Sequence, residues 1–189
     1  MKTVTDNVNT IIIKNSRFIC LLYYVDDVSK ALELLNNSKF LYKDATHYCY
    51  AYIINYVSKC SDDGEPSGTA GMPMLQVLKR NALNNVLCIV IRYFGKILLG
   101  ANGLVRAYSN SVTECLKNSI VIRNPGYLVT IVFDYNQLKK MDYFLKDISN
   151  IEKNFNDKVI YKFCCSVELY DKLVENGCCD VEINSDVYI

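Results

Sequence analysis

Two glycine-rich segments hold most of the side chains in this chain that could do chemistry. The first reads SDDGEPSGTAG over residues 61–71, and the second reads RYFGKILLGANGLVRAYS over residues 92–109. Each joins a turn to the start of an expected helix, where backbone N–H groups lack partners within the helix and carry partial positive charge. Charged side chains lie at both junctions. We therefore expect the two junctions to meet in one pocket of mixed charge that holds an anion or a partner.

An acidic turn in the first segment supplies three carboxylates. Asp62, Asp63 and Glu65 lie within four residues of one another, beside Gly64 and Pro66. Carboxylates at this density can bind a divalent cation or supply a general base. Aspartate, glycine and proline are also the residues that a tight turn requires for its backbone geometry. A metal centre normally needs further carboxylates or histidines and the chain has one histidine, so we predict no metal and no cofactor.

Small residues follow the acidic turn, from Ser67 to Gly71. They let backbone N–H groups approach a phosphate or carboxylate closely at the start of a helix expected over residues 69–80. Thr69 is the expected N-cap of that helix. The run matches neither the phosphate loop GxxxxGKS/T nor GxGxxG, which argues against a nucleotide-hydrolysing site. Close packing of the backbone explains the small residues equally well.

Arginines mark the second segment. Arg106 falls in the first turn of a helix expected over residues 102–118, where the helix dipole disfavours a cation by about 0.3–1 kcal/mol. Some other interaction must therefore hold Arg106, either an external anion or a carboxylate of Asp63 or Glu65. Arg92, at the end of the preceding strand, could join it. An internal ion pair and a clamp on a ligand are equally supported by these residue types.

His47 is the one imidazole of the chain and lies on a strand expected over residues 47–57. Alternation along this strand puts His47 on one face and Tyr50, with the neighbouring tyrosines, on the other. No cysteine is spaced to form a nucleophilic pair with His47, so we give His47, Asp62 and Tyr50 accessory roles. The tyrosine face could stack RNA bases, but it is more typical of a core that helices cover.

Composition indicates a folded cytoplasmic protein. The chain has 189 residues, of which 51% are hydrophobic, enough to build a core. No apolar stretch approaches the roughly 18–20 residues of a membrane span, so we expect no membrane association. Nine cysteines with no CxxC pattern indicate reduced, mostly buried thiols. Residues 1–124 hold 14 lysines and arginines against nine acids, whereas residues 125–189 hold seven against 11, so the basic first part is the one expected to face polyanions.

Hydrophobic patterns predict a two-domain α/β (α+β) protein, with domains over residues 1–124 and 125–189. In the first domain we expect strands near residues 8–13, 17–24, 47–57 and 86–94 and helices near residues 28–37, 69–80 and 102–118. The continuous apolar run VLCIVIRYF over residues 86–94 is typical of a central strand covered on both faces. The periodic pattern breaks at residues 123–126. In the second domain the expected order is strand 127–133, helix 135–148, strands 151–156 and 158–167, helix 168–176 and strand 180–189, which is the ferredoxin-like βαββαβ pattern.

Together these motifs resemble the YigZ/IMPACT family. The matching stretches are Ser16-Arg17-Phe18-Ile19, Asp44-Ala45 with His47, Ala51-Tyr52, the run from Ser61 to Gly71, Arg92-Tyr93-Phe94-Gly95 and the run from Gly103 to Ser109. SDDGEPSGTAG and RYFG with GLVRAYS at this separation are highly specific to the family. The resemblance covers roughly residues 9–116, and the tail resembles the smaller second domain of the bacterial members.

The resemblance implies a fold and a cellular process. The first domain should be similar to the second domain of a small-subunit ribosomal protein, and the second domain to the C-terminal domains of elongation factor G. Eukaryotic relatives regulate translation during amino-acid starvation by competing for a co-activator of an initiation-factor kinase. Both likenesses therefore point toward the translation apparatus, although a fold by itself is a weak argument for function.

This chain departs from the family pattern at two glycines. The family usually has RYFGG and GAGGL, where this chain has RYFGK and GANGL, so Lys96 and Asn102 replace glycines. If those positions have positive φ, asparagine tolerates it better than lysine does. Lys96 also adds a cation beside the expected anion site, which favours a ligand clamp.

We therefore predict a non-catalytic, translation-associated regulator that binds RNA, the ribosome or a protein of the translation apparatus. The predicted binding residues are Asp63, Glu65, Ser67, Thr69, Arg92, Lys96 and Arg106. Replacing both Arg92 and Arg106 by alanine should weaken binding and leave the fold intact. One alternative is a hydrolase for a small phosphorylated or peptide substrate, with Asp63 or Glu65 as the base and a divalent ion. Another is protein docking through the sheet surface.

Overall fold

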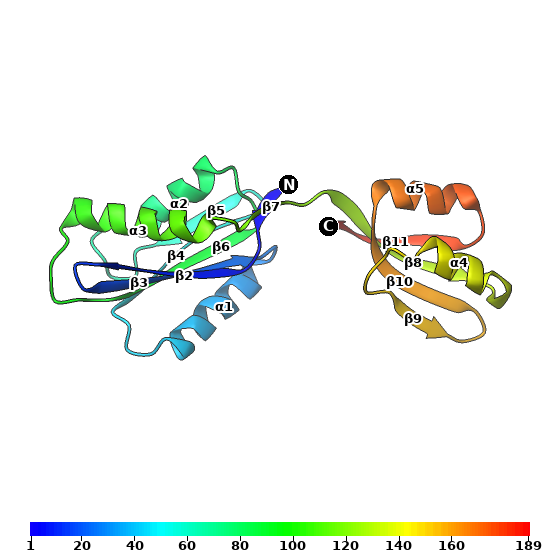
Figure 1. The fold of residues 1–189 in the computed structure, drawn as a ribbon, viewed down its shortest axis with the longest axis horizontal. Coiled ribbons are helices and arrows are strands. Elements are labelled where there is room, and N and C mark those ends of the chain that lie inside the picture. Colours follow the sequence, from blue (N-terminus) through cyan, green and yellow to red (C-terminus); the bar gives the residue numbers. More distant parts are fainter. The chain divides into compact units, whose positions relative to one another are not determined.

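The computed structural model describes residues 1–189, which divide into two compact units. One unit is Lys2–Ile122, and the other is Arg123–Ile189 together with Met1. Each mixes helices with an antiparallel sheet, so the predicted α+β class is confirmed (Figure 1). No helix has both the length and the apolar character needed to span a membrane.

A five-stranded antiparallel sheet forms the centre of the N-terminal unit, in the order β2-β3-β6-β4-β5. Its strands are β2 (Asn7–Ile13), β3 (Ser16–Tyr24), β4 (His47–Ile54), β5 (Val57–Ser61) and β6 (Val86–Tyr93). Strand β1 (Lys2–Val4) pairs separately with β7 (Ile120–Ile122). The middle position of β6 confirms the prediction from its continuous apolar run.

Helices cover both faces of this sheet (Figure 1). Helices α2 (Gly71–Arg80) and α3 (Ala101–Leu116) pack on one face, where Cys88 and Val90 of β6 point. Helix α1 (Val28–Leu41) packs on the other face, against Leu87, Ile89 and Ile91. The alternation of β6 side chains between two cores is what a strand buried on both faces requires.

The tyrosine-rich strand β4 shows the same alternation. Cys49 and Ala51 join the core under α2 and α3, whereas Tyr52 joins the core under α1. Tyr48 and Tyr50 are partly buried against the same α1 core, and the rings of Tyr50 and Tyr52 are stacked with centroids 6.3 Å apart. The tyrosine face is therefore mostly core, as its pattern indicated.

Three boundaries differ from the sequence expectation. The strand expected over residues 47–57 ends at Ile54, because Asn55 and Tyr56 adopt φ of 47° and 65° and turn the chain into β5. Positive φ at both turn residues suits a two-residue hairpin, so the missed strand β5 completes that hairpin. Helix α1 continues to Leu41, beyond its expected end. Helix α2 begins at Gly71 with Ala70 as its N-cap residue, so the prediction of Thr69 as N-cap was wrong.

The C-terminal unit is a four-stranded antiparallel sheet in the order β11-β8-β10-β9. Its elements are β8 (Pro125–Phe133), the 3-10 turn η1 (Tyr135–Gln137), α4 (Leu138–Phe144), β9 (Glu152–Phe155), β10 (Val159–Ser166), α5 (Val167–Asn176) and β11 (Asp180–Tyr188). This connectivity is the predicted ferredoxin-like pattern. The helix expected over residues 135–148 is shorter, because its first turn is 3-10 and α4 ends at Phe144.

Candidate functional site

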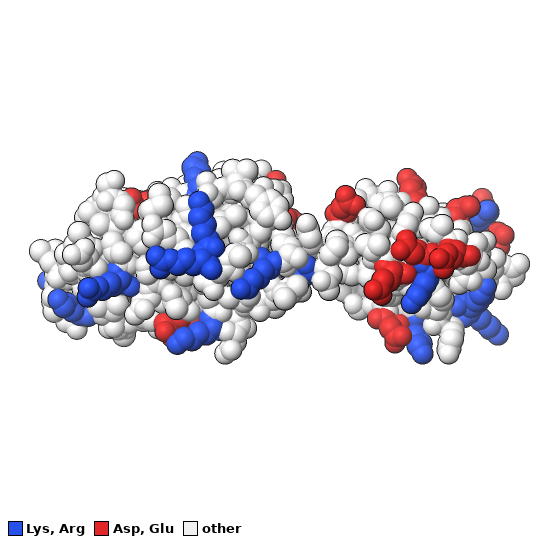
Figure 2. Space-filling model, turned by 90° about the horizontal axis from the view of Figure 1, so that it is seen from above, with Lys and Arg blue, Asp and Glu red and all other residues white.

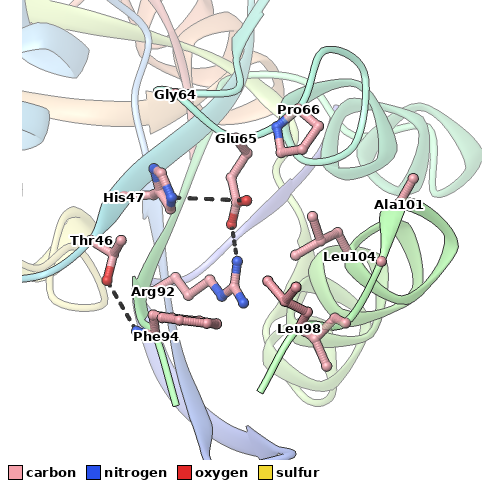
Figure 3. Close-up of a pocket in the computed structure, with 12 residues that line it drawn as sticks. Thr46, His47, Gly64, Glu65, Pro66, Arg92, Phe94, Leu98, Ala101 and Leu104 are labelled. Carbon is pink, nitrogen blue, oxygen red and sulfur yellow. Dashed lines mark hydrogen bonds and ion pairs between the residues drawn. The ribbon is translucent and has the colours of Figure 1, made fainter. Parts of the chain in front are cut away.

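A cavity of about 380 Å³ lies in the N-terminal unit where the two glycine-rich junctions meet (Figure 3). It is lined by Thr46, His47, Gly64, Glu65, Pro66, Arg92, Phe94, Leu98, Leu99, Gly100, Ala101 and Leu104. These residues come from the start of β4, the loop before α2, the end of β6 and the loop that leads into α3. Segments far apart in the sequence therefore share one concave surface with apolar walls and a few polar groups, the usual composition of a small-molecule site.

A buried ion pair joins two of the elements at this cavity. Arg92 Nη1 lies 2.6 Å from Glu65 Oε1, and the two residues are 5% and 8% exposed. The hydroxyl of Tyr108 on α3 donates to the same carboxylate oxygen at 2.7 Å. The guanidinium also lies 5.3 Å from the ring centroids of Phe18 and Phe94. The internal arginine–carboxylate pair is thus made by Arg92, and it ties β6, α3 and the acidic turn together.

His47 completes the polar side of the cavity. Its Nδ1 lies 2.8 Å from the carbonyl oxygen of Asp63. Because a carbonyl oxygen can only accept, Nδ1 carries the hydrogen of that bond. The other ring nitrogen, Nε2, lies 3.9 Å from Glu65 Oε2, too far for a direct hydrogen bond. Figure 3 shows the Glu65 side chain between His47 and Arg92, with Leu98 and Leu104 opposite.

The two aspartates of the acidic turn are used to build the turn. Asp62 accepts hydrogen bonds from the backbone N–H groups of Gly68, Ala70 and Gly71, so it takes the capping role predicted for Thr69. Partial burial alone would raise the pKa of the Asp62 carboxyl, but these three bonds favour the charged form and the net pKa is lowered. Asp63 Oδ2 accepts from the Tyr48 backbone N–H at 2.7 Å.

Cys49 and Tyr108 lie behind the ion pair. Burial raises the pKa of the Cys49 thiol to about 12, so the thiol stays protonated at neutral pH and lacks thiolate character. It lies 3.0 Å from the carbonyl oxygen of Asp62, to which it donates. Burial, together with the nearby Cys49 and Glu65, raises the pKa of Tyr108 as well. Both groups act as neutral hydrogen-bond donors within the network.

Tyr108 is the member of the network that sequence reasoning missed. The helical spacing of Leu104, Tyr108 and Val112 indicated only an apolar stripe. A tyrosine on a buried stripe nevertheless needs a partner for its hydroxyl. A buried glutamate in a facing loop is such a partner, so the signal was present in the residue type.

Several predicted binding residues lie away from the cavity. Ser67, Lys96 and Arg106 are exposed and do not line it, and no ion pair joins Arg106 to Asp63 or Glu65. Thr69 is buried, and its hydroxyl donates to the carbonyl oxygen of Pro66 at 2.6 Å. The prediction that one pocket holds all the predicted charged residues was therefore wrong. Arg106 lies on the solvent side of α3, whereas Leu104 faces inward.

The two residues that replace family glycines differ in backbone conformation: Lys96 lies in the β6–α3 loop and has positive φ, whereas Asn102 lies within helix α3 and does not. A Cβ at Gly95 would lie 2.1 Å from the backbone carbon of Asn15, so this position has no room for a side chain. Lys96, next to it, adopts φ of 64°, a conformation that lysine rarely takes. Asn102 lies within α3 and has ordinary helical geometry. The loop thus keeps a left-handed residue at position 96 although lysine stands there.

Comparison with known proteins places this site in a family. Residues 14–116, more than half of the chain, match the Impact N-terminal domain, and every residue of the cavity falls within that match. The chain belongs to the IMPACT family. IMPACT family member YvyE of Bacillus subtilis (strain 168) is 43% identical over 149 residues, which cover 73% of this chain and 69% of the relative. IMPACT family member YigZ of Escherichia coli (strain K12) is 37% identical over 139 residues, which cover 70% of this chain and 68% of the relative.

A solved structure of similar fold supports the same assignment. It is described as the crystal structure of a hypothetical protein and is 28% identical, with a TM-score of 0.63. The match covers 95% of this chain and 96% of that chain. The two-domain architecture is therefore shared with this similar protein along nearly its whole length.

Proposed function

We propose that this IMPACT-family chain is a translation-associated regulator that acts by binding RNA through the face formed by α2 and α3. Family membership supports the cellular process, because the resemblance to the IMPACT family implies a role in translation. The observation that carries RNA as the partner is the charge of that face. Phosphate contacts by lysine and arginine supply most of the affinity of non-specific RNA binding.

Exposed basic side chains are unopposed over most of the α2–α3 face. Lys79 and Arg80 lie in the last turn of α2, Arg106 lies on α3 and Lys117 follows α3, and all four are exposed. Glu114 is the one acidic residue on the two helices, and it pairs with Lys117 at 2.6 Å. Figure 2, which views the molecule from the side of these helices, shows lysine and arginine spread over this unit with little acidic surface between them.

The opposite face of the same unit is a natural control. Helix α1 carries Lys30 and Lys39 but also Glu33, and Asp26 and Asp27 precede it. A phosphate chain therefore meets mixed charge there. The contrast between the two faces supports α2 and α3 as the contact surface, with Arg106 kept from the predicted site and Arg80 added to it.

The arrangement of the carboxylates favours binding over hydrolysis. A general base needs a carboxylate that can reach a substrate proton. Asp62 and Asp63 already accept hydrogen bonds from backbone N–H groups, and Glu65 Oε1 accepts from Arg92 and Tyr108, so both aspartates and one oxygen of Glu65 serve the fold. Arg92 is buried, so it is not available to contact RNA, and its replacement would disturb the core.

A pull-down from a lysate of translating cells tests the proposal. We expect ribosomal RNA and ribosomal proteins to co-purify with the chain, and nuclease treatment to release them. The variant Arg80→Ala with Arg106→Ala should lose this association, whereas the matched variant Lys30→Ala with Lys39→Ala on α1 should keep it. Association that survives nuclease and both variants would mean that a protein is the partner and would refute RNA binding.

A further inference from the structure

The cavity beside the Glu65–Arg92 pair has polar groups that the chain itself does not satisfy. Glu65 Oε1 accepts from both Arg92 and Tyr108, but no donor lies within hydrogen-bond distance of Oε2, although the side chain is only 3% exposed. Arg92 Nε is buried and has no acceptor. A fully buried polar atom without a partner, such as Arg92 Nε, is rare in folded proteins and costs about 1–3 kcal/mol, whereas Glu65 belongs to the lining of the cavity and its Oε2 is open to the cavity's contents. Glu65 Oε2 can therefore accept a hydrogen bond from a molecule that occupies the cavity.

Two acceptors face one another across the open side of the cavity. The hydrogen of His47 is committed at Nδ1, because the Asp63 carbonyl oxygen 2.8 Å away can only accept. In the neutral imidazole, His47 Nε2 then presents a lone pair toward Glu65 Oε2, 3.9 Å away. One nitrogen placed about 2.9 Å from each of the two atoms would donate to both at ordinary hydrogen-bond length. A hydroxyl has one hydrogen and serves one acceptor, whereas an NH2 group has two.

The charge of the cavity selects a neutral ligand. Glu65 and Arg92 form a pair 2.6 Å apart, so their charges compensate. An ammonium group at Glu65 Oε2 would add an uncompensated cation close to the guanidinium, and charge that is buried without a partner is costly. The remaining walls are apolar, chiefly Phe94, Leu98, Leu99 and Leu104. The space of about 380 Å³ suits a ring-sized body rather than a polymer.

We propose that this cavity binds a small neutral molecule with an NH2 group on an apolar ring, the NH2 group donating to His47 Nε2 and Glu65 Oε2. The ring lies against the leucines of the β6–α3 loop and α3. Primary aromatic amides and ring systems with an exocyclic amine are members of this class. The inference is independent of RNA binding, because the α2–α3 basic face and the cavity use different residues.

The single histidine makes the test direct. Uniform ¹⁵N labelling of histidine in the full-length chain gives ring signals from His47 alone. We expect the signals at pH 7.5 to show the neutral Nδ1–H tautomer, and benzamide to move the Nε2 signal in a saturable way. N,N-dimethylbenzamide has the same ring but no N–H donor, so it should bind roughly 10-fold or more weakly, the loss expected for two hydrogen bonds of ordinary strength.

Two tryptophan variants locate the probe. Ala101 is an exposed residue that lines the cavity, so Ala101→Trp should block it and abolish the benzamide response. Asn102 is its exposed neighbour outside the lining, and Asn102→Trp should leave the response unchanged. The proposal is overturned by an imidazolium at pH 7.5, by no response to benzamide, by equal affinity for the two amides, or by a response that survives Ala101→Trp.

Discussion

The two units of this molecule differ in whether charged side chains enter the core. The N-terminal core under α2 and α3 admits an ion pair, Arg92 with Glu65, and the hydroxyl of Tyr108. The C-terminal core contains no charged side chain, and the Tyr161 hydroxyl within it reaches the surface carboxylate of Asp142, which pairs with Lys153. A buried ion pair often adds no net stability over well-packed apolar residues of similar volume, so we infer that the charged network of the N-terminal unit has a role besides stability.

The charged network of the N-terminal unit lies in the wall of the cavity. Three members of the network, His47, Glu65 and Arg92, line the same cavity, and Cys49 and Tyr108 lie behind them. The C-terminal pair Asp142 and Lys153 is 44% and 38% exposed and is screened by solvent. The difference in burial implies that breaking the Glu65–Arg92 pair lowers the free energy of unfolding more than breaking the Asp142–Lys153 pair does.

The largest effect is expected from breaking the buried pair. Arg92→Met removes the cation and leaves the Glu65 carboxylate buried with Tyr108 as its one direct donor. The free energy of unfolding should fall by about 3–5 kcal/mol, as measured by urea denaturation. The double variant Arg92→Met with Glu65→Leu removes both charges and should recover most of the loss. If the double variant is as unstable as the single one, the cost is not that of an unpaired charge.

A smaller, pH-dependent effect is expected from the capping aspartate. Asp62→Asn weakens the acceptor for three backbone N–H groups at the start of α2 and should cost about 1–2 kcal/mol at neutral pH. The folded-state pKa of Asp62 is lowered, so its stabilisation is present above the unfolded value of about 3.9 and is lost as the pH falls through the folded value. The stability difference between wild type and variant should therefore shrink below about pH 4. A difference that stays constant down to pH 2 would contradict this account.

The smallest effect is expected in the C-terminal unit. The hydrogen bond from Lys153 lowers the pKa of Asp142, but both side chains are well exposed. Lys153→Met should change the free energy of unfolding by less than about 1 kcal/mol, and 0.5 M salt should remove most of that change. A loss as large as that of Arg92→Met would erase the distinction between the two units.

Local pattern predicted much of the fold. The continuous apolar run of β6 indicated a strand covered on both faces, and the order of elements after residue 126 indicated the ferredoxin-like unit. Both predictions depend on periodicity and chain order, which a single sequence displays. The β4–β5 hairpin was missed because Asn-Tyr, unlike Asn-Gly, is not a sequence pair that predicts a two-residue turn. Asn55 and Tyr56 nevertheless both have positive φ.

The candidate site was predicted only in part, for a physical reason. The sequence supported an internal arginine–carboxylate pair and a clamp on a ligand equally, and Arg92 and Arg106 were both available to Glu65. The choice depends on which side chain points inward once β6 and α3 pack, and Arg106 lies on the exposed side of its helix. Lys96 and Ser67 were assigned from proximity in sequence, and the loop geometry turns both toward solvent.

The most direct test of the central claim is the salt dependence of RNA affinity. For the full-length chain on a single-stranded RNA, the slope of log affinity against log salt measures how many phosphates are neutralised, at about 0.7 per contact. We expect Arg80→Ala with Arg106→Ala to reduce the slope by about 1.4, and Lys30→Ala with Lys39→Ala to leave it unchanged. An unchanged slope in the first variant, or no measurable RNA binding by the wild type, would contradict the account.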